Sequence, residues 1–472
     1  MKEIGLLRGM GLCRRYGRMG LAAREALQAA RLREMVLWAR EHSPFYRLLY
    51  RDIGPDFDLK DLPPVDKVQL MDRFDEWLCD PDVKWADLER FMENPDHIGR
   101  RFRGKYLVFT TSGSTGNPLV VLYDETANNV MSAMTALRSF ARPADMRAFI
   151  RRGGKTIGVF ATGGFYLSNS SVRARQLSMP WKRNQIAVTS ALLPTAQIVS
   201  ELNAFQPAML GGYPSNLELL IDEQASGRLC IRPMIIMTGG EYLSESLRGR
   251  LADAFHCYVQ TSYACTEAGT LACECAERHL HVNDDWVLLE PVDAAGRPVP
   301  DGEQAEKLLV TNLFNFTQPF IRYALTDRVV LHREPCACGN PAPWLTLEGR
   351  TDDVVRFEQA GVEIRIAPLA LYAVLKEVRQ VRRFQLVAHP GNRIELRLEP
   401  APGADQESAF AQAQAALSPF LAAHGVSAYE IHLSDQLPRQ REVQAHHRAG
   451  GRVSRALSAF RPPTSSQIPP QA

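Results

Sequence analysis

Long apolar runs are missing from this chain, which has no stretch of the roughly 18 residues that a membrane-spanning helix requires. The first 40 residues carry several basic side chains but no uninterrupted apolar core, so we expect helix there and not a signal peptide. The alternative for this segment is contact with an anionic membrane or a partner. We therefore expect a cytoplasmic protein without stable membrane insertion.

An excess of charge of one sign is also lacking. The formal net charge is +2, from 55 Lys and Arg against 53 Asp and Glu, and this near balance gives no sign of a general nucleic-acid binder. The nine cysteines are odd in number and follow no secretion signal, which argues against a disulfide framework. A chain of 472 residues that is 45% hydrophobic fits a soluble globular protein of two or three domains.

Two familiar catalytic motifs are absent, and so are internal repeats. The segment "GGKT" at 153–156 is not a Walker loop, because the glycine that such a loop requires at position 149 is replaced by Phe149. The chain also has no Gly-x-Ser-x-Gly motif, which leaves hydrolase chemistry without support.

The pattern of apolar residues predicts an α/β fold. Residues 1–100 read as a mostly helical lead-in. From about 105 to 330, short apolar runs alternate with helical segments, which is typical of parallel α/β architecture. The predicted strands are "YLVFT", "LVVLY", "TIGVFAT", "PAMLGG", "PMIIMTGG" and "HCYVQTSYA". Ligands of such folds bind at the carboxyl ends of the strands.

The character of the chain changes near residue 285, where strands joined by polar turns begin. After Arg350 a small α+β unit is predicted. We therefore expect a large N-terminal domain at 1–349 with stacked mixed and parallel sheets, a small mobile domain at 350–460, and a disordered tail at 461–472.

Five hydroxyls and two glycines stand between two predicted strands in "TTSGSTGNP" at 110–118. Such a loop offers backbone N–H groups and hydroxyls to an anion, although a polar surface hairpin has the same composition. The loop resembles the signature loop of the adenylate-forming superfamily, which includes acyl-CoA synthetases, luciferases and nonribosomal peptide adenylation domains.

Four further segments resemble motifs of that superfamily, in the same order along the chain. They are "MTGGEYLS" at 237–244, "SYACTEAG" at 262–269, "FIRYALTD" at 320–327 and "GRTDDVVRFEQAGVEIRIAP" at 349–368. Ala264 replaces the usual glycine of the second, and the third also lacks its glycine. The segments "LWAREHSPFYRLLY", "GGYPSNL" and "ECAERHLHVNDDWVLLE" are similar to the phenylacetate-CoA ligase branch, and the resemblance covers about 36–375.

The resemblance implies an AMP-forming acid–thiol ligase that uses ATP and Mg²⁺. A carboxylate would attack the α-phosphorus to give an acyl-adenylate and pyrophosphate, and catalysis would consist of positioning and charge stabilisation. In this reading Thr266 donates to the α-phosphate, Glu267 binds Mg²⁺ and Asp327 accepts from the ribose hydroxyls. The remaining ATP-binding residues would be Ser112, Gly113, Ser114, Thr115, Gly116, Gly239, Gly240, Glu241 and Arg350.

The second step that the resemblance implies is transfer of the acyl group to the thiol of CoA or of a carrier-protein phosphopantetheine. The small domain would rotate about a hinge acid, with Asp352 as first choice and Asp353 as second.

The chain departs from the family where a lysine serves the first step, because Arg452 stands there and no lysine follows Lys376. Tyr372 also replaces a common glutamate. Arginine keeps the charge but presents a planar fork. Either Arg452 serves adenylation, or another cation does, or the chain is a nucleotide- or metal-binding pseudoenzyme.

Two Cys-x-Cys pairs suggest a structural zinc site. Zinc favours four nitrogen and sulfur ligands from short segments. The predicted ligands are Cys275, His281, Cys336 and Cys338, with Cys273 and His279 as alternates, and the competing reading is inert buried cysteines.

An aromatic acid is the acyl substrate that the branch favours, by analogy alone. Phe165, Tyr166 and Tyr213 would form the pocket wall and Ser215 would orient a polar substituent of the acid, unless these aromatic residues belong to the core. The expected partners are therefore the small acid, ATP and the thiol carrier, with a homodimer left open.

Overall fold

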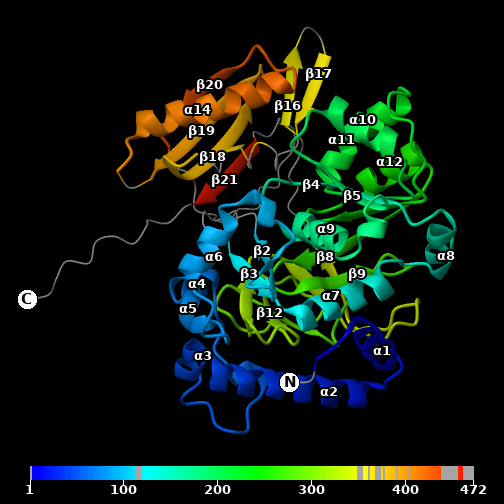
Figure 1. The fold of residues 1–472 in the computed structure, drawn as a ribbon, viewed down its shortest axis with the longest axis vertical. Coiled ribbons are helices and arrows are strands. Elements are labelled where there is room, and N and C mark those ends of the chain that lie inside the picture. The colour runs from blue at the N-terminus through cyan, green and yellow to red at the C-terminus, as the bar shows by residue number, and fades with distance from the viewer. Residues whose placement is uncertain are drawn as a thin grey trace, which may run out of the picture.

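The computed structural model describes residues 3–111 and 119–347, and then 355–359, 362–366, 371, 374–375, 378–389, 391–401, 403–436 and 455–460. Figure 1 shows the N-terminal helices along the bottom of the molecule, the sheets across its middle and the C-terminal elements at the top. Among these residues, no helix combines the length and the apolar character that crossing a membrane requires.

Short helices form the first hundred residues, as the sequence predicts. The longest is α2 (Leu21–His42), which is followed directly by α3 (Pro44–Leu49) because Ser43 caps α3 through its side chain and Pro44 fits the first helical turn. The others are α1 (Leu6–Tyr16), η1 (Leu59–Asp61), α4 (Lys67–Asp72), α5 (Phe74–Trp77), α6 (Trp85–Met92) and η2 (Pro95–His97).

Nine strands form the largest sheet within the described residues, in the order β14-β15-β10-β9-β8-β7-β6-β4-β5. Neighbouring strands are parallel from β5 to β8 and antiparallel from β8 to β14. The strands are β4 (Thr156–Phe160), β5 (Ile186–Ser190), β6 (Met209–Gly212), β7 (Ile235–Gly239), β8 (Tyr258–Cys265), β9 (Gly269–Glu274), β10 (Leu280–Val282), β14 (Val329–His332) and β15 (Trp344–Leu347).

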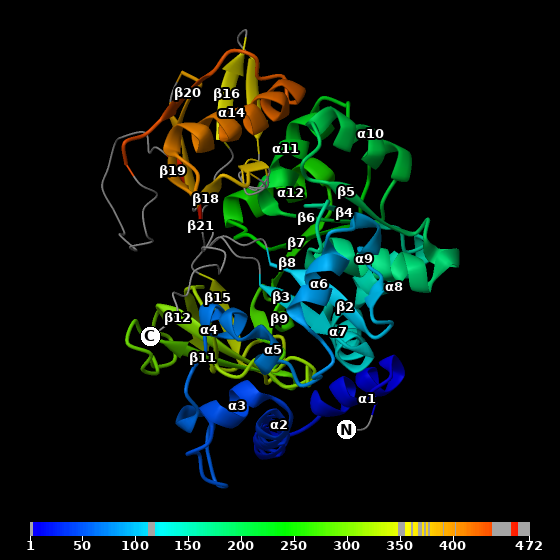
Figure 2. The same ribbon diagram turned by 60° about the vertical axis from the view of Figure 1, so that its left-hand side comes forward.

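Helices connect the parallel strands, as crossover connections require. Figure 2 shows α10, α11 and α12 grouped at one end of this sheet, with α7, α8 and α9 nearer the N-terminal helices. Their bounds are α7 (Glu125–Arg138), α8 (Pro143–Arg151), α9 (Leu167–Ser178), η3 (Pro180–Lys182), α10 (Thr195–Phe205), α11 (Pro214–Ala225) and α12 (Glu245–Phe255).

Two smaller antiparallel sheets lie beside the large one. The polar loop predicted to bind an anion joins β2 to β3, and a connection this short can only return the chain as a hairpin. These two strands therefore lie outside the parallel sheet in which the sequence pattern placed them. The strands are β1 (Arg101–Phe102), β2 (Tyr106–Thr110), β3 (Val120–Tyr123), β11 (Val287–Val292), β12 (Lys307–Asn312) and β13 (Tyr323–Leu325).

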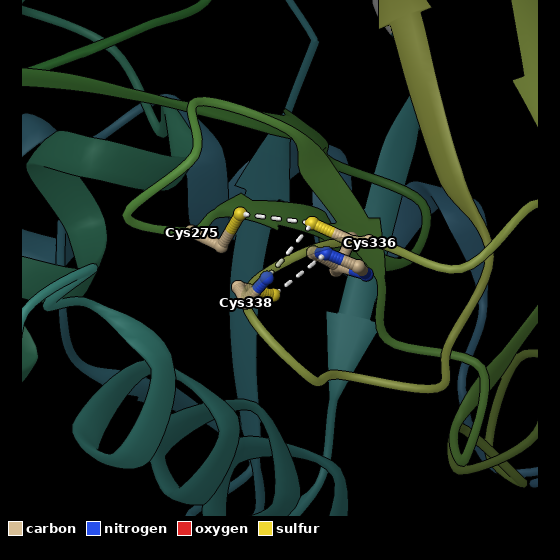
Figure 3. A group of neighbouring side chains, drawn as sticks. Cys275, Cys336 and Cys338 are labelled. Carbon is tan, nitrogen blue, oxygen red and sulfur yellow. Dashed lines mark hydrogen bonds between the residues drawn. The ribbon is translucent and has the colours of Figure 1, made fainter.

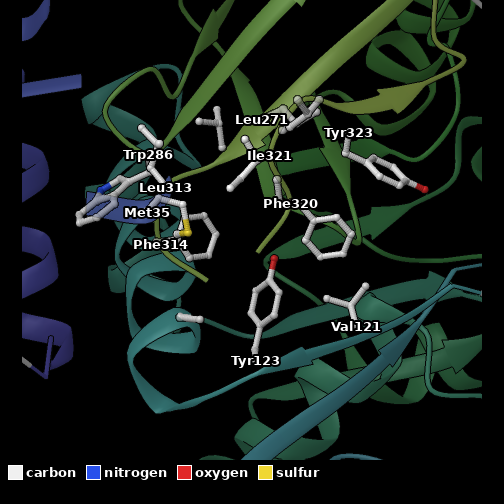
Figure 4. Close-up of a cluster of buried hydrophobic side chains, with 14 of the residues drawn as sticks. Met35, Val121, Tyr123, Leu271, Trp286, Leu313, Phe314, Phe320, Ile321 and Tyr323 are labelled. Carbon is white, nitrogen blue, oxygen red and sulfur yellow. The ribbon is translucent and has the colours of Figure 1, made fainter. Parts of the chain in front are cut away.

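The N-terminal helices share a hydrophobic core with the smaller sheets and with β9 and β10, while the parallel strands and α10–α12 form a second core. Figure 4 shows Met35 of α2 among buried side chains of other elements, including Tyr123, Trp286 and Phe314. Polar contacts of α2 add to this attachment, since Arg24 lies 3.7 Å from the carboxylate of Asp284 and the side-chain amide of Gln28 donates to the Asp284 carbonyl at 2.9 Å. The lead-in is therefore an integral layer of the large portion of the molecule.

The C-terminal elements have a hydrophobic core of their own. In it, α14 (Gln406–Ala423) buries Ala409, Ala413, Leu417 and Leu421 against neighbouring strands. Its strands are β16 (Val355–Gln359), β17 (Val362–Ile366), β18 (Val381–His389), β19 (Arg393–Pro400), β20 (Glu430–Leu433) and β21 (Arg455–Phe460). The predicted mixed α/β fold with a small α+β unit is confirmed.

Candidate active site

A cleft of about 3840 Å³ opens among β2, β4, β6, β7, β8 and β13. Several segments that resemble the superfamily's motifs meet in it. Its lining includes Gly239, Gly240 and Glu241 after β7, Thr266 and Glu267 in the turn from β8 to β9, and Asp327 after β13. Residues far apart in sequence are thus gathered at one site, as the order of the motifs suggests.

Glu267 is a buried carboxylate in the cleft wall, with 5% of its surface exposed. Burial raises its pKa, while hydrogen bonds from Cys265 and Tyr323 act in the opposite direction. The side-chain amide of Asn312 donates to its backbone carbonyl at 2.9 Å, which fixes the turn. A fixed, buried carboxylate beside open space is suited to binding a cation.

Asp327 also lines the cleft and accepts a hydrogen bond from the hydroxyl of Tyr263 at 3.0 Å. Burial and the negative charge of Asp327 keep the pKa of Tyr263 well above its usual value, so this hydroxyl remains a donor. This bond orients one carboxylate oxygen, and the remaining lone pairs of the Asp327 carboxylate can accept hydrogen bonds from a ligand in the cleft.

Glu241 ties the turn after β7 to the start of α11. Its carboxylate accepts from the backbone N–H of Ser215 at 3.0 Å and from the Ser215 hydroxyl at 2.9 Å. A carboxylate at a helix N-terminus is favoured by the unpaired N–H groups and the helix dipole. Ser215 is buried, its hydroxyl donates to Glu241, and it is not among the cleft-lining residues.

Gly240 belongs to the same turn and has a φ of +79°. A Cβ at this position would lie 2.9 Å from the ring of Tyr213. Glycine is therefore required twice, by the left-handed backbone and by the close approach of the ring.

Aromatic rings form part of the cleft wall. The rings of Phe160 and Tyr213 meet edge to face with centroids 5.2 Å apart. Phe160 covers Gly158, where a Cβ would lie 2.4 Å from the ring, and Gly211 on the neighbouring strand. Burial raises the pKa of Tyr213 to about 12, so its hydroxyl stays protonated at neutral pH. Tyr166 also lines the cleft.

Phe165 lies in the hydrophobic core and is absent from the cleft lining. Its ring packs against Phe91 at a centroid distance of 6.0 Å. Because successive side chains of extended backbone point to opposite sides, Tyr166 and not Phe165 reaches the cleft.

Lys67, the first residue of α4, is a half-buried cation in the cleft wall. Burial lowers its pKa to about 8, while the charge of Glu267 acts in the opposite direction. Neither Lys67 nor Phe160 was predicted from the sequence. The signal for Phe160 was the alternation in "TIGVF", which puts Gly158 and Phe160 on one face of β4.

Several predicted residues lie outside the residues that the structure describes. They are Ser112, Gly113, Ser114, Thr115 and Gly116 of the hydroxyl-rich loop, Arg350, the hinge acids Asp352 and Asp353, Tyr372 and Arg452.

The four predicted metal ligands come together in the structure. One ligand atom each from Cys275, His281, Cys336 and Cys338 lies within 4.8 Å of all the others. The sulfurs of Cys275 and Cys336 are 3.8 Å apart, and the Cys338 sulfur lies 3.3 Å from Nε2 of His281 (Figure 3). The cluster joins β9 and β10 to the loop between β14 and β15.

Neighbouring groups orient these side chains. Nδ1 of His281 lies 2.8 Å from the carbonyl oxygen of Ala342. When the ring carries its hydrogen on Nδ1, it donates to this carbonyl and presents the lone pair of Nε2 to the sulfurs. Backbone N–H groups of Cys338 and Asn340 donate to the sulfurs of Cys336 and Cys338 at 3.5 and 3.4 Å.

The two alternate ligands behave differently from each other. Nδ1 of His279 lies 3.2 Å from the Cys336 sulfur, and its ring stacks on Trp344 at 3.8 Å. Cys273 lies apart from the cluster beside Asn283, and burial raises the pKa of its thiol to about 11. Two residues spaced by two on one strand would share a face, but β9 ends at Glu274, so Cys275 lies beyond the strand and joins the cluster while Cys273 does not.

Known proteins were compared with this sequence and structure. No protein-family profile matches the chain. The phenylacetate-coenzyme A ligase of Thermus thermophilus is 26% identical over 372 residues, which cover 75% of this chain and 76% of that protein. Protein CapK of Staphylococcus aureus is 28% identical over 140 residues, or 29% of each chain.

Solved structures give the same fold. A crystal structure of 2-hydroxyisobutyryl-CoA ligase with 2-HIB-AMP and CoA has a TM-score of 0.59 at 19% identity, covering 91% of this chain and 90% of that chain. The chain therefore has the fold of adenylate-forming ligases. The chain is similar in sequence to phenylacetate-coenzyme A ligase over three quarters of its length, so the resemblance stated from the sequence is confirmed.

Proposed function

We propose that this protein activates an aromatic carboxylic acid with ATP and transfers the acyl group to a thiol. The observation that carries the proposal is the cleft in which Thr266, the buried Glu267 and the Asp327–Tyr263 pair lie together. The homology to a phenylacetate-coenzyme A ligase supports this activity. No feature of the described residues favours a pseudoenzyme, and Arg452, which motivates that alternative, lies outside them.

In the first step the acid's carboxylate oxygen forms a bond to the α-phosphorus, and the bond from that phosphorus to the bridging oxygen breaks. Pyrophosphate leaves with the bonding electrons, and the acyl-adenylate remains. Negative charge grows on the phosphate oxygens, where fixed donors and cations stabilise it best. Thr266 would donate to the α-phosphate and Asp327 would accept from the ribose hydroxyls.

The residues of the cleft fit a bound Mg²⁺. Glu267 offers a buried, oriented carboxylate, the type of ligand that a hard cation prefers. When bound, the ion would neutralise charge on the phosphates. Gly239, Gly240 and Glu241 would border the adenine, with Glu241 holding its turn against α11 through Ser215.

The acyl group would lie against Phe160, Tyr166 and Tyr213, and these rings favour an aromatic acid. In the second step a thiolate would attack the acyl carbon of the adenylate and AMP would leave. We propose CoA as the thiol, because the relative is a coenzyme A ligase, with carrier-protein phosphopantetheine as the second candidate.

ATP–pyrophosphate exchange against a panel of aryl, arylacetic and short aliphatic acids tests this proposal. We expect acid-dependent exchange that is greatest with an aryl or arylacetic acid. Adding CoA or a carrier protein then identifies the acceptor. Retained ATP binding without exchange for any acid would overturn the proposal, and exchange only with aliphatic acids would overturn its substrate class.

We also infer that Cys275, His281, Cys336 and Cys338 bind a structural zinc ion. With Zn–S bonds of about 2.3 Å and tetrahedral angles, two sulfurs of a zinc site lie about 3.8 Å apart. The Cys275–Cys336 separation of 3.8 Å agrees with this geometry. Four protein ligands close the site to substrate, so the ion would pin β9 and β10 to the loop before β15.

Metal analysis tests the zinc proposal. We expect one zinc per wild-type chain and loss of the metal in Cys336→Ser. Cys230→Ser is the matched control, because Cys230 is exposed and outside the cluster. Chelation should lower the midpoint of thermal unfolding, and added zinc should restore it, because zinc binds the folded state. Wild-type protein without stoichiometric zinc would contradict the proposal.

A further inference from the structure

A lysine in the N-terminal portion faces the proposed site of phosphate chemistry. Lys67 lies in the same cleft as Thr266, Glu267 and Asp327, although about 200 residues of sequence separate it from them. We propose that Lys67 is a phosphate-binding residue that supplies a fixed positive charge during adenylation. This inference rests on the proposed function and adds to it a residue that the superfamily motifs of this chain do not include.

Backbone hydrogen bonds fix the segment that carries Lys67. The N–H of Val65 donates to the carbonyl of Arg322 at 3.1 Å, and the N–H of Ala324 donates to the carbonyl of Val65 at 2.9 Å. Val65 thus forms a parallel bridge with Tyr323 of β13. Two residues after this bridge the chain reaches Lys67, and three residues after Ala324 it reaches Asp327. One short pairing therefore positions both side chains.

A capping box fixes the start of α4 just before Lys67. The N–H of Gln69 donates to the Asp66 carboxylate at 2.9 Å, and the Gln69 side chain accepts from the N–H of Asp66 at 3.0 Å. Lys67 is the first residue of the helix, so its backbone has little freedom. Its ammonium group is consequently delivered to the cleft by a rigid support, which lowers the entropic cost of binding a phosphate.

The surroundings of Lys67 also match this role. Its electrostatic neighbour is Glu267, which in turn is hydrogen-bonded to Tyr323. If Glu267 binds Mg²⁺ with the phosphates, a neighbouring ammonium reaches the same group of oxygens. The cleft wall also contains the basic residues Arg100, Arg101, Arg175, Lys182 and Lys307, and hydrogen bonds to the backbone engage the first two of them. Arg100 and Arg101 donate to the backbone carbonyls of Asp96 and Lys105.

The chemistry needs such a charge in the first step more than in the second. Bond formation at the α-phosphorus builds charge on phosphate oxygens and releases pyrophosphate, whereas thioester formation occurs at the acyl carbon. A lysine donating to a phosphate should therefore affect mainly the first step. The competing role is structural, as an ion pair with Glu267 that only stabilises the fold.

Lys67→Ala, Lys67→Gln and Lys67→Arg separate these roles, with Lys60→Ala as the matched control. Lys60 is also N-terminal to β1, but its side chain is exposed and pairs with Asp58. Each variant is assayed for ATP–pyrophosphate exchange with the best acid, and for thioester formation from chemically prepared acyl-adenylate and CoA. Thermal unfolding confirms that each variant is folded.

For Lys67→Ala and Lys67→Gln we expect exchange to fall roughly 10- to 100-fold, the range of one hydrogen bond to a charged group. Thioester formation from supplied adenylate should change much less, Lys67→Arg should recover part of the exchange, and Lys60→Ala should resemble wild type. Exchange unchanged in the folded neutral variants overturns the role of Lys67, as does equal loss in both steps. Wild-type protein without exchange overturns the proposed function itself.

Discussion

Single residues carry the chemistry proposed for this protein, and Glu267 is the most consequential of them. Its carboxylate is buried in the cleft wall, and burial raises its pKa, whereas a bound cation would stabilise the charged form. Tyr323 and the amide of Asn312 hold the carboxylate and its backbone in place. A carboxylate held this rigidly is suited to binding a metal ion.

Glu267→Gln keeps the size of the side chain and removes its charge. We expect exchange to fall by about 100-fold or more, because electrostatic stabilisation of the phosphates is lost. ATP binding should weaken less than the rate falls. The control is Glu277→Gln, since Glu277 is exposed and outside the cleft. Exchange near the wild-type rate in the Glu267 variant would refute the metal assignment.

At this scale the sequence predicted some residues and missed others for physical reasons. Cys275, His281, Cys336 and Cys338 could be predicted because they form two groups of close sequence neighbours. Cys275 lies near His281 and Cys336 lies near Cys338, and such short spacing limits where the side chains can lie. Lys67 could not be predicted, because its position depends on the pairing of Val65 with Tyr323, far away in sequence. Phe165 and Tyr166 were both predicted to line the acyl pocket, but only Tyr166 does. Neighbouring side chains of an extended segment point to opposite faces, and the sequence does not show which of the two faces the cleft.

At the scale of elements, the turn after β7 shows how the site is positioned. Gly239 and Gly240 follow a buried strand, and the turn is fixed to α11 by Glu241 and to the Tyr213 ring by Gly240. Replacing Gly240 by alanine should displace this turn, because a Cβ would lie 2.9 Å from the ring. The left-handed backbone adds about 1 kcal/mol of strain.

Gly240→Ala should therefore raise KM for ATP in the exchange assay. Gly227→Ala is the matched control, since Gly227 has a φ of +77° but no atom within 4 Å of the added Cβ. Both variants should lose similar stability from backbone strain, measured by thermal unfolding, and only Gly240→Ala should lose affinity for ATP. Equal KM values for the two variants would show that the turn does not border the nucleotide.

Elements were predictable in proportion to the strength of their apolar pattern. Strands β4, β6, β7 and β8 are buried and were expected from their apolar runs. Strand β5 was missed, because this edge strand is only partly buried and contains the polar residues Thr189 and Ser190. The antiparallel pairing of β2 and β3 follows from their short connection and not from their composition.

At the scale of the whole molecule, separate cores underlie the two portions of the chain. The core around α14 is distinct from the cores of the large portion, although Leu192 and Leu219 of the large portion pack against it. A division at 349/350 with a hinge at Asp352 remains a proposal, because that segment lies outside the described residues. The fold was predictable because the motifs occur in order, whereas the relative position of the portions depends on contacts that no local pattern encodes.

The central claim is that the cleft adenylates a carboxylic acid, and direct detection of the adenylate tests it best. Wild-type protein is mixed with ATP, Mg²⁺ and the acids of the exchange panel, without thiol, and the quenched reactions are analysed by mass spectrometry. We predict an acyl-AMP with at least one aryl or arylacetic acid, formed with an equal amount of pyrophosphate and strongly reduced in Glu267→Gln. No acyl-AMP from any acid, in protein that still binds ATP, would contradict the account.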